Sequence, residues 1–512
     1  MKTLVIGLDG ATYNVLEPLL DEGRLPNLQN LIETGTAGTL DSTVPPATYP
    51  AWKCYSTGQH PTKLGFHSFL GFKQGNLEPA STDAPEIWDY VCEQGGTAAS
   101  INMPTSYPAS ELDGFMTSGY VIGGDDWIYP EEMREFVEEE FDYRPEVSFP
   151  VHTELLAEDT AEARAEIRSV MQSRFELAKF ALNELSLDFL QLTMYYTDTY
   201  QHFFWNQPEI LNEMWEYVDE QLGDVLDRVP DGTNVFVVSD HGFERLDTGI
   251  FYLNRWLEKE GYLTLEGNET TGLFERLSVD TKTLSAWLDR FGLMPLVRAL
   301  VPESTRRKVP NPRGEVGVDQ LSERLVWEES DAVMYGGGIF LNVDRLGPRY
   351  EEVRTELMER VTEITSPETG DPVLVDAYRP EELYAPGETL PRDDDEVPDV
   401  LLLPRDEGFV SPAYSPNVWN TTDLEGRWSV HAKPGIFIAN GPDIRESSAD
   451  LDIFDVAPTV LHAMGYPIAE EMDGRVRKDI FSAESEPATR EVEYRGERTR
   501  IDSAVRALED GL

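Results

Sequence analysis

Short apolar runs that end in polar residues, with helical patterns between them, constrain the fold of this chain most. A continuous apolar run as long as one strand is typical of a β-strand that is covered on both faces. The clearest runs are residues 4–8, 187–195, 234–238 and 435–439. Amphipathic patterns that predict helices lie between them, at residues 25–34, 161–185 and 209–229. This alternation predicts an α/β fold, a mostly parallel central sheet flanked by helices, with ligands at the carboxyl ends of the strands.

The stretch of residues 265–395 departs from this alternation. It contains a proline-interrupted helical pattern at residues 276–300, a Pro- and Arg-rich segment at 302–313, two strand patterns around a glycine turn at 332–343 and a helix pattern at 349–365. We therefore interpret residues 265–395 as an inserted cap that sets substrate specificity. The catalytic core would then comprise residues 1–264 and 396–483, followed by a charged tail at residues 484–512.

The charge of the chain excludes whole classes of partner. Asp and Glu number 95 against 42 Lys and Arg, so the formal net charge is -53. A surface this acidic repels nucleic-acid phosphates and anionic lipids, so we expect neither nucleic acid nor a membrane as a partner. Acidic residues spread over a whole chain suggest adaptation to concentrated salt, which screens their mutual repulsion. The apolar run near the N-terminus is too short for a secretory signal, so we expect a cytoplasmic protein.

Histidine and aspartate residues gather where the predicted strands end, and His431 lies in a predicted loop just before the run at residues 435–439. Asp198 and His202 lie four residues apart, which places both on one face of a helical turn. With only two cysteines in the chain, a metal site has to use imidazole and carboxylate ligands, which suit Zn²⁺, with Mn²⁺ or Fe as alternatives. The candidate metal ligands are Asp9, Asp198, His202, Asp240, His241 and His431.

Thr48 is the candidate nucleophile. It stands in the segment PPATYPAW, residues 45–52, where Pro50 fits a first helical turn and makes Thr48 the predicted N-cap. A plain structural cap is the alternative role for this residue. However, the start of a helix also attracts phosphate oxygens, and a threonine hydroxyl that binds a metal ion can attack phosphorus.

Five segments, in this order, resemble the type I phosphodiesterase/nucleotide pyrophosphatase family of the alkaline phosphatase superfamily. They are LVIGLDG, PPATYPAWKCYSTGQHP, DFLQLTMYYTDTYQH, VFVVSDHGF and HAKPGIFIANGPDI. The resemblance implies an alkaline-phosphatase-like sandwich. It also implies a metal-dependent hydrolase that cleaves phosphodiester or nucleotide pyrophosphate bonds through a phospho-threonine intermediate.

The same resemblance implies two divalent metal ions. One ion would be held by Asp198, His202 and His431. The other ion would be held by Asp9, Asp240 and His241, together with the oxygen of Thr48. The expected partner is a small phosphate ester, with a nucleotide as one candidate.

Two departures from the family pattern bear on the substrate. Nucleotide pyrophosphatases of this family carry a phosphate-binding Asn downstream of the nucleophile, whereas this chain has Gly65-Phe66-His67-Ser68-Phe69, with His67 or Ser68 as possible substitutes. Classical alkaline phosphatases clamp a monoester with an Arg after the nucleophile, and this chain has no Arg between Arg24 and Arg134. This absence favours a diester, with Lys63 and Lys433 as alternative clamps.

Several alternatives stay open from the sequence. Within the superfamily they are a phosphomonoesterase, a phosphomutase and a phosphonate hydrolase, whereas the residues after Thr48 do not fit a sulfatase pattern. Outside enzymes, the alternative is a metal-stabilised binding module. Residues that match no ligand position are interpreted as structural or as core packing: His60, His152, His462, Trp52, Trp88, Trp127 and Trp205.

Overall fold

The chain forms two compact units. The computed structural model describes residues 1–68, 70–73, 76–80, 82–119, 124–148, 151–155, 160–246, 249–266, 317–384, 397–405, 408–421 and 428–496. The first unit comprises residues 1–64, 82–246 and 425–512, and the second comprises residues 65–81 and 247–424.

The predicted cap, residues 265–395, falls within the second unit. Its helical pattern at 276–300 and its Pro- and Arg-rich segment at 302–313 lie outside the described residues, as does most of the charged tail, from residue 497 onward. The role of the cap in substrate specificity stays a prediction.

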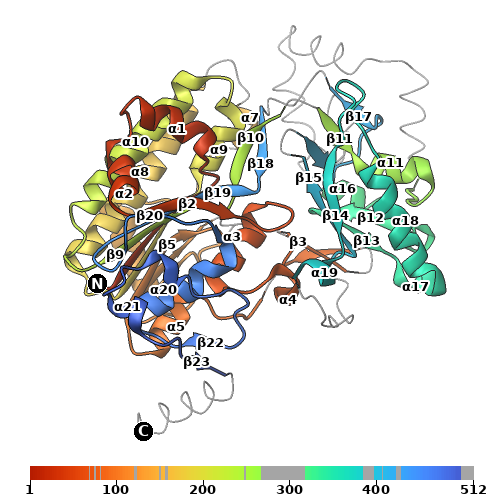
Figure 1. Cartoon of the computed structure of the whole chain (residues 1–512). Helices are drawn as coiled ribbons and strands as arrows, with labels where there is room; N and C mark the ends of the chain where they lie inside the picture. Colours follow the sequence, from red (N-terminus) through yellow and green to blue (C-terminus); the bar gives the residue numbers. More distant parts are fainter. Residues whose placement is uncertain are drawn as a thin grey trace. The chain divides into compact units, whose positions relative to one another are not determined.

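Three parallel strands form the centre of the sheet in the first unit (Figure 1). β1 (Thr3–Leu8) pairs with β8 (Phe189–Met194) on one side and with β9 (Asn234–Val238) on the other. All residues of these strands are buried, as their continuous apolar pattern predicted. Thr3 is in register with the first residue of both neighbours, so the three strands reach the same edge of the sheet together.

The sheet continues on both sides of this centre. Beyond β8, the strands β5 (Ala98–Met103) and β6 (Gly114–Ser118) extend it in parallel. Beyond β9, the fourth predicted run forms β19 (Pro434–Asn440), which is antiparallel to β9 and to β2 (Thr36–Asp41). The sheet is therefore mostly parallel, as predicted, with an antiparallel strand beside β9.

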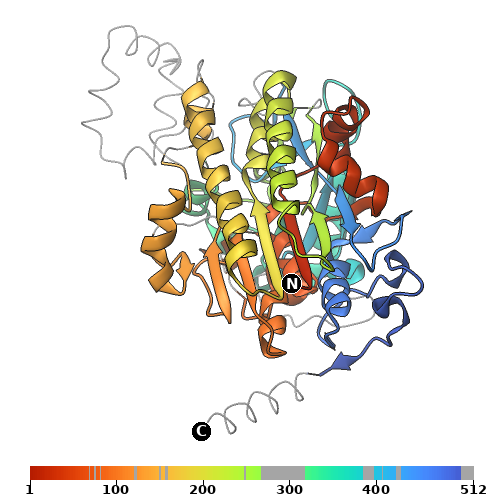
Figure 2. The same ribbon diagram turned by 90° about the vertical axis from the view of Figure 1, so that its left-hand side faces the viewer.

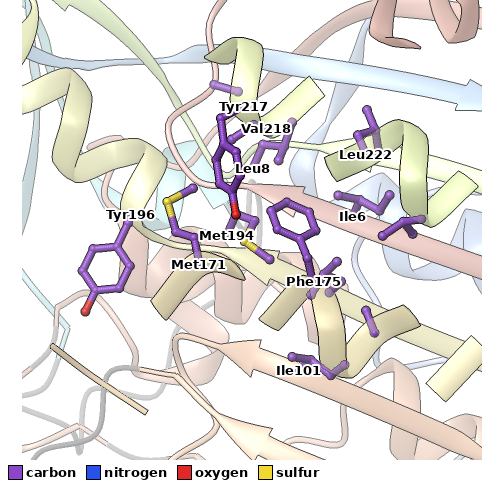
Figure 3. Close-up of a cluster of buried hydrophobic side chains, with 14 of the residues drawn as sticks. Ile6, Leu8, Ile101, Met171, Phe175, Met194, Tyr196, Tyr217, Val218 and Leu222 are labelled. Atoms are coloured by element: carbon purple, nitrogen blue, oxygen red, sulfur yellow. The ribbon is translucent and has the colours of Figure 1, made fainter. Parts of the chain in front are cut away.

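Helices cover both faces of this sheet (Figure 1), and α8 and α10 run side by side over one of them (Figure 2). The predicted helices are α2 (Pro26–Thr34), α8 (Ala161–Glu184) and α10 (Pro208–Leu226), each within a few residues of the expected bounds. Apolar side chains of β1, α8 and α10 form one buried cluster, which includes Ile6, Phe175 and Leu222 (Figure 3). The opposite face is covered by α3 (Thr48–Thr57), α5 (Ile87–Glu93) and α20 (Val456–Met464).

The other helices and strands of the first unit are short, apart from helices α1, α6 and α9. They are α1 (Tyr13–Asp21), α4 (Pro61–Leu64), β7 (Ile128–Tyr129), α6 (Arg134–Phe141), α7 (Val151–Glu154), α9 (Tyr196–Phe204), β10 (Gly242–Arg245), β18 (Ser429–Ala432), β20 (Ser447–Ser448), β21 (Leu451–Asp452), β22 (Ile468–Ala469), α21 (Glu486–Thr489) and β23 (Tyr494–Arg495). None of the helices in the described residues has the length and the apolar composition needed to cross a bilayer.

The second unit is built on an antiparallel sheet of its own, in the order β12, β13, β15, β14. β12 (Ala332–Tyr335) and β13 (Gly338–Leu341) are the strands predicted around a glycine turn, and α18 (Tyr350–Thr362) is the helix predicted next to them. The remaining elements are β3 (Leu70–Lys73), β4 (Asn76–Pro79), β11 (Ile250–Tyr252), α11 (Leu253–Glu260), α16 (Val318–Ser322), α17 (Val343–Leu346), β14 (Leu374–Tyr378), α19 (Pro380–Tyr384), β15 (Val400–Pro404), β16 (Phe409–Ser411) and β17 (Trp419–Asn420).

Candidate active site

The six candidate ligands meet at one edge of the sheet in the first unit. Asp9 directly follows β1, Asp198 lies in α9 just after β8, and Asp240 follows β9. Because these three strands are parallel and end together, their following residues lie near one another. β19 runs the opposite way, so the residues that precede it reach this same edge.

His431 is placed here by that antiparallel strand. The sequence predicted a loop for it, but His431 lies within β18, which pairs with β10 so that His431 stands opposite Phe243. The prediction of a loop was wrong because the alternation in this short segment becomes a strand only through its pairing with β10.

Asp9, Asp240 and His241 form the first group of converging ligands. All three side chains are fully buried. His241 Nε2 lies 3.2 Å from Asp240 Oδ2 and 3.8 Å from Asp9 Oδ1. His241 Nδ1 lies 3.1 Å from the carbonyl oxygen of Gly242, which fits a protonated Nδ1 and leaves Nε2 as the available ligand atom.

Each of the two carboxylates uses one oxygen in a hydrogen bond and leaves the other without one. Trp52 Nε1 donates to Asp9 Oδ2 over 2.8 Å, and the backbone N–H of Gly10 donates to Asp240 Oδ1 over 3.0 Å. Asp9 Oδ1 and Asp240 Oδ2 are buried with no hydrogen-bond partner. Buried acceptors are rarely left unsatisfied in this way, so the pair fits a bound divalent cation.

The electrostatics of this group support the same interpretation. Burial raises the pKa of Asp9 well above its usual value, and the nearby Asp240 carboxylate raises it further. Burial also raises the pKa of Asp240. The pKa of His241 is well below its usual value because of burial and the neighbouring His431, which favours the neutral imidazole, the form that binds metal ions. A divalent cation would offset the repulsion between the two carboxylates.

Asp198, His202 and His431 form the second group. Asp198 and His202 both lie in α9, whose helical geometry brings residues four apart to one face, as predicted. His431 Nε2 lies 3.1 Å from Asp198 Oδ1 and 2.9 Å from His202 Nε2. Burial raises the pKa of Asp198, but the imidazoles of His202 and His431 outweigh this effect and lower it overall. A carboxylate and two imidazoles that converge in this way fit a second cation.

The two groups adjoin one another. The imidazole rings of His241 and His431 are stacked, with their centroids 3.7 Å apart. Asp198, His241 and His431 also offer ligand atoms that lie within 4.8 Å of one another. His241 is therefore within reach of both groups.

Thr48 lies beside the first group. Its Oγ1 is 3.1 Å from His241 Nε2. The predicted N-cap role was wrong by one residue, because Ala47 has the extended backbone of an N-cap and α3 begins at Thr48 itself. The first turn of a helix presents backbone N–H groups without intrahelical acceptors, so the start of α3 suits a phosphoryl group.

Two aromatic residues at the site escaped the sequence prediction. Trp52 is fully buried, as expected for a core residue, but its indole N–H also binds a candidate ligand. The ring of Phe243 contacts the imidazoles of His202 and His431, with centroids 4.7 and 5.0 Å away. The one signal for Phe243 was its place two residues after His241, and nothing local distinguishes Trp52 from a packing residue.

The predicted lysine clamps have carboxylate partners elsewhere. Lys63 Nζ lies 3.0 Å from Asp473 Oδ1, and Lys433 Nζ lies 2.8 Å from Asp41 Oδ2. His67 and Ser68 belong to the second unit, where His67 is buried and burial lowers its pKa to about 3.

The remaining histidines have structural surroundings where the structure describes them. His60 packs against Phe454, and buried His462 has its Nε2 2.8 Å from the carbonyl oxygen of Pro487. The side chain of His152 lies outside the described residues.

Comparison with known proteins gives one family and one fold. The model of the type I phosphodiesterase / nucleotide pyrophosphatase family matches residues 3–427. The structure of murine ectonucleotide pyrophosphatase / phosphodiesterase 5 matches with a TM-score of 0.52 and 13% identity, over 94% of this chain and 100% of that chain.

Two further structures match over the same shares of both chains, each with a TM-score of 0.50 and 12% identity. They are the human ectonucleotide pyrophosphatase / phosphodiesterase 5 and an inactive variant of the murine protein in complex with AMP. No curated protein gives a match to the sequence.

Proposed function

Because the chain belongs to the type I phosphodiesterase/nucleotide pyrophosphatase family and has its alkaline-phosphatase-like α/β fold, we propose a metal-dependent hydrolase that acts through a phospho-threonine intermediate. Membership of the family makes the chain a phosphodiesterase/nucleotide pyrophosphatase enzyme. One observation carries the finer proposal. The unsatisfied oxygens of Asp9 and Asp240 converge on His241, and Thr48 Oγ1 lies beside that same imidazole.

Two groups of residues would hold the metal ions. Asp9, Asp240, His241 and the oxygen of Thr48 would hold one, and Asp198, His202 and His431 the other. The mixed carboxylate and imidazole donors suit Zn²⁺, with Mn²⁺ or Fe as alternatives. When bound, such a pair of ions supplies positive charge that stabilises the attacking and leaving oxygens of a phosphoryl transfer.

Different residues of the chain then have different roles in the reaction. Thr48 Oγ1 loses its proton to solvent and forms a bond to phosphorus while the bond from phosphorus to the leaving oxygen breaks, which leaves a phosphate ester on Thr48 and frees the leaving group. Water then attacks phosphorus and the bond from phosphorus to Oγ1 breaks, so that the phosphate product leaves and Oγ1 regains a proton. The first turn of α3 directs N–H groups toward the phosphoryl oxygens. The full burial of Asp9, Asp240 and His241 keeps bulk water from screening these charges.

The neighbouring structures support a nucleotide substrate and a threonine nucleophile. One murine neighbour is described as in complex with AMP, and the inactive variant in that complex carries a threonine-to-alanine substitution. We propose that this chain takes a small phosphate diester or a nucleotide-type pyrophosphate. Both lysines proposed as clamps are paired with carboxylates, so the extra charge of a monoester has no matching cation among them.

The diester should therefore react faster than the monoester. With Zn²⁺ or Mn²⁺ present, we expect kcat/KM for bis-p-nitrophenyl phosphate to exceed that for p-nitrophenyl phosphate by about tenfold or more, which corresponds to about 1.4 kcal/mol of transition-state stabilisation. Release of p-nitrophenolate measures both reactions. A faster monoester reaction would overturn the proposed substrate class and leave the enzyme in the same superfamily.

We also propose that the fold is adapted to high salt, because the net charge of -53 makes the folded state repel itself. The free energy of unfolding, measured by urea denaturation, should increase by a few kcal/mol when KCl is raised from about 0.1 M to about 2 M. The exposed residues Glu138, Glu139 and Glu140 of α6 offer a matched control. Changing all three to Gln should raise the stability in dilute buffer and weaken the salt dependence. Equal stability of the wild-type protein at both salt concentrations would contradict this proposal.

A further inference from the structure

Trp52 differs from two other fully buried tryptophans in that its indole N–H donates a hydrogen bond. Trp52, Trp88 and Trp215 are all fully buried. The Nε1 atoms of Trp88 and Trp215 have no hydrogen-bond partner in the described structure, whereas Nε1 of Trp52 donates to Asp9 Oδ2 over 2.8 Å. The bond is therefore a specific feature of this position, because burial of an indole in this core does not by itself bring it a partner.

The hydrogen bond fixes which oxygen of Asp9 is available. With Oδ2 engaged by Trp52, the other oxygen, Oδ1, is the one that lies 3.8 Å from His241 Nε2 and has no hydrogen-bond partner. A ligating carboxylate that is held by a hydrogen bond to its second oxygen keeps one orientation toward its cation. Without the indole N–H, the carboxylate of Asp9 would have two unsatisfied oxygens and could rotate between them.

Trp52 also links this carboxylate to the helix that carries the nucleophile. Thr48 and Trp52 lie four residues apart in α3, so they project from the same face of the helix. Tyr55, one turn further on, donates from its hydroxyl group to Gln191 Oε1 over 2.5 Å and packs edge-on against the Trp52 ring, with centroids 5.3 Å apart. The helix is therefore anchored to β8 by Tyr55 and to the end of β1 by Trp52.

Gly7 makes room for the indole where it crosses β1. A Cβ atom at this position would lie only 2.6 Å from Cη2 of Trp52, in the body of a rigid, fully buried ring. Any larger residue at position 7 would have to displace the ring or the strand. The glycine in the first strand and the tryptophan in α3 therefore form one packing unit.

We propose that Trp52 is a positioning residue that orients the Asp9 carboxylate toward its metal ion and sets the register of the Thr48 helix against it. The inference rests on the proposed function in one respect, since it takes Asp9 as a metal ligand. Nothing in the proposal requires Trp52 to touch the substrate.

The test measures metal affinity rather than turnover. Zn²⁺ is titrated into the metal-free protein in competition with a chromophoric chelator, for the wild type and for Trp52→Phe, which keeps an aromatic ring and removes the N–H. The affinity of one of the bound Zn²⁺ ions should fall by about 10–100-fold. Trp88→Phe and Trp215→Phe delete an N–H group that has no partner, so they should bind Zn²⁺ within about twofold of the wild type. The melting temperature of each metal-free variant reports the general cost of removing a buried indole.

Three results would decide the matter. If Trp52→Phe binds Zn²⁺ as tightly as Trp215→Phe while Asp9→Asn loses affinity, the positioning role is wrong and the proposed function stands. If Asp9→Asn also keeps wild-type affinity, Asp9 is no ligand, and both the inference and the proposed metal group fall. Should Trp52→Phe not fold, Gly7→Ala displaces the indole from the other side. A weaker Zn²⁺ affinity in that variant supports the proposal, and an unchanged affinity overturns it.

Discussion

Thr48→Ala is expected to lower kcat/KM for bis-p-nitrophenyl phosphate by about 10³–10⁵-fold, because removal of a nucleophile removes the covalent route altogether. Thr48→Ser keeps a hydroxyl group at the start of α3 and should retain substantial activity. Thr48 is half-buried and its side chain does not cap α3, so removal of its hydroxyl group should cost little stability, and the loss should arise at the chemical step. Steady-state kinetics measure the loss, and acid quenching followed by mass spectrometry detects the Thr48 ester in the wild type, which carries the p-nitrophenyl phosphoryl group that remains after one p-nitrophenolate leaves.

A threonine in the same helix provides the control for this prediction. Thr57 is buried near the end of α3, and its hydroxyl group donates to the carbonyl oxygen of Lys53 over 2.7 Å. Thr57→Ala loses this hydrogen bond and the one that the hydroxyl group accepts from the backbone N–H of Gln59 over 3.3 Å. It leaves the ligand groups untouched, so kcat/KM should change by only a few-fold. If Thr48→Ala keeps wild-type activity, or if the phosphate is found on another residue, the proposed intermediate is wrong.

Asp240→Asn is expected to have two effects of opposite sign. Loss of a carboxylate ligand should lower the activity by about 10³-fold or more. It should also remove the thermal stabilisation that Zn²⁺ provides at this group, which for tight binding amounts to about 4 kcal/mol at a thousandfold excess over Kd, while the group of Asp198, His202 and His431 still binds its ion. The metal-free variant, by contrast, should be more stable than the metal-free wild type by about 1–3 kcal/mol. The oxygen of the new amide still accepts the hydrogen bond from the backbone N–H of Gly10. Its NH₂ group replaces Asp240 Oδ2, which has no partner in the wild type, and offers a donor near Asp9 Oδ1, which has none either.

Asp219 is the matched control because it is a buried aspartate whose hydrogen bonds are satisfied. It accepts from the backbone N–H groups of Leu28 and Asn27 at the start of α2, over 2.8 and 3.2 Å. Asp219→Asn should lower the stability, since the negative charge of Asp219 stabilises the N-terminus of α2. It should leave the Zn²⁺ response intact. Thermal melting with EDTA and with Zn²⁺ measures both variants. A Zn²⁺-dependent shift of normal size in Asp240→Asn would show that this carboxylate holds no metal.

Local pattern was sufficient for the elements that carry the site. The apolar runs at residues 4–8 and 234–238 predicted β1 and β9 to within one residue, because a strand buried on both faces leaves no alternation. The spacing of Asp198 and His202 predicted their shared helix face, which α9 confirms. These inferences involve residues that are close together in the chain, where backbone geometry alone sets which side chains meet.

Local pattern failed where a position depends on a distant partner. His431 lies in a strand only because β18 pairs with β10. The N–H of Trp52 reaches Asp9 only because Gly7 lets the indole cross β1. Residues 65–81 belong to the second unit, although no change of composition in the sequence indicates this. In each case the deciding contact joins segments that are far apart in sequence.

The order of residues establishes which side chains follow each strand, and so the kind of chemistry that the chain supports. The convergence of these side chains depends on the folded chain, because the antiparallel direction of β19 brings His431 to the edge where β1, β8 and β9 end. The hydrophobic periodicity of a segment predicts whether its strand is buried. The direction of the neighbouring strand depends on backbone hydrogen bonds between the strands, and the local sequence does not predict it.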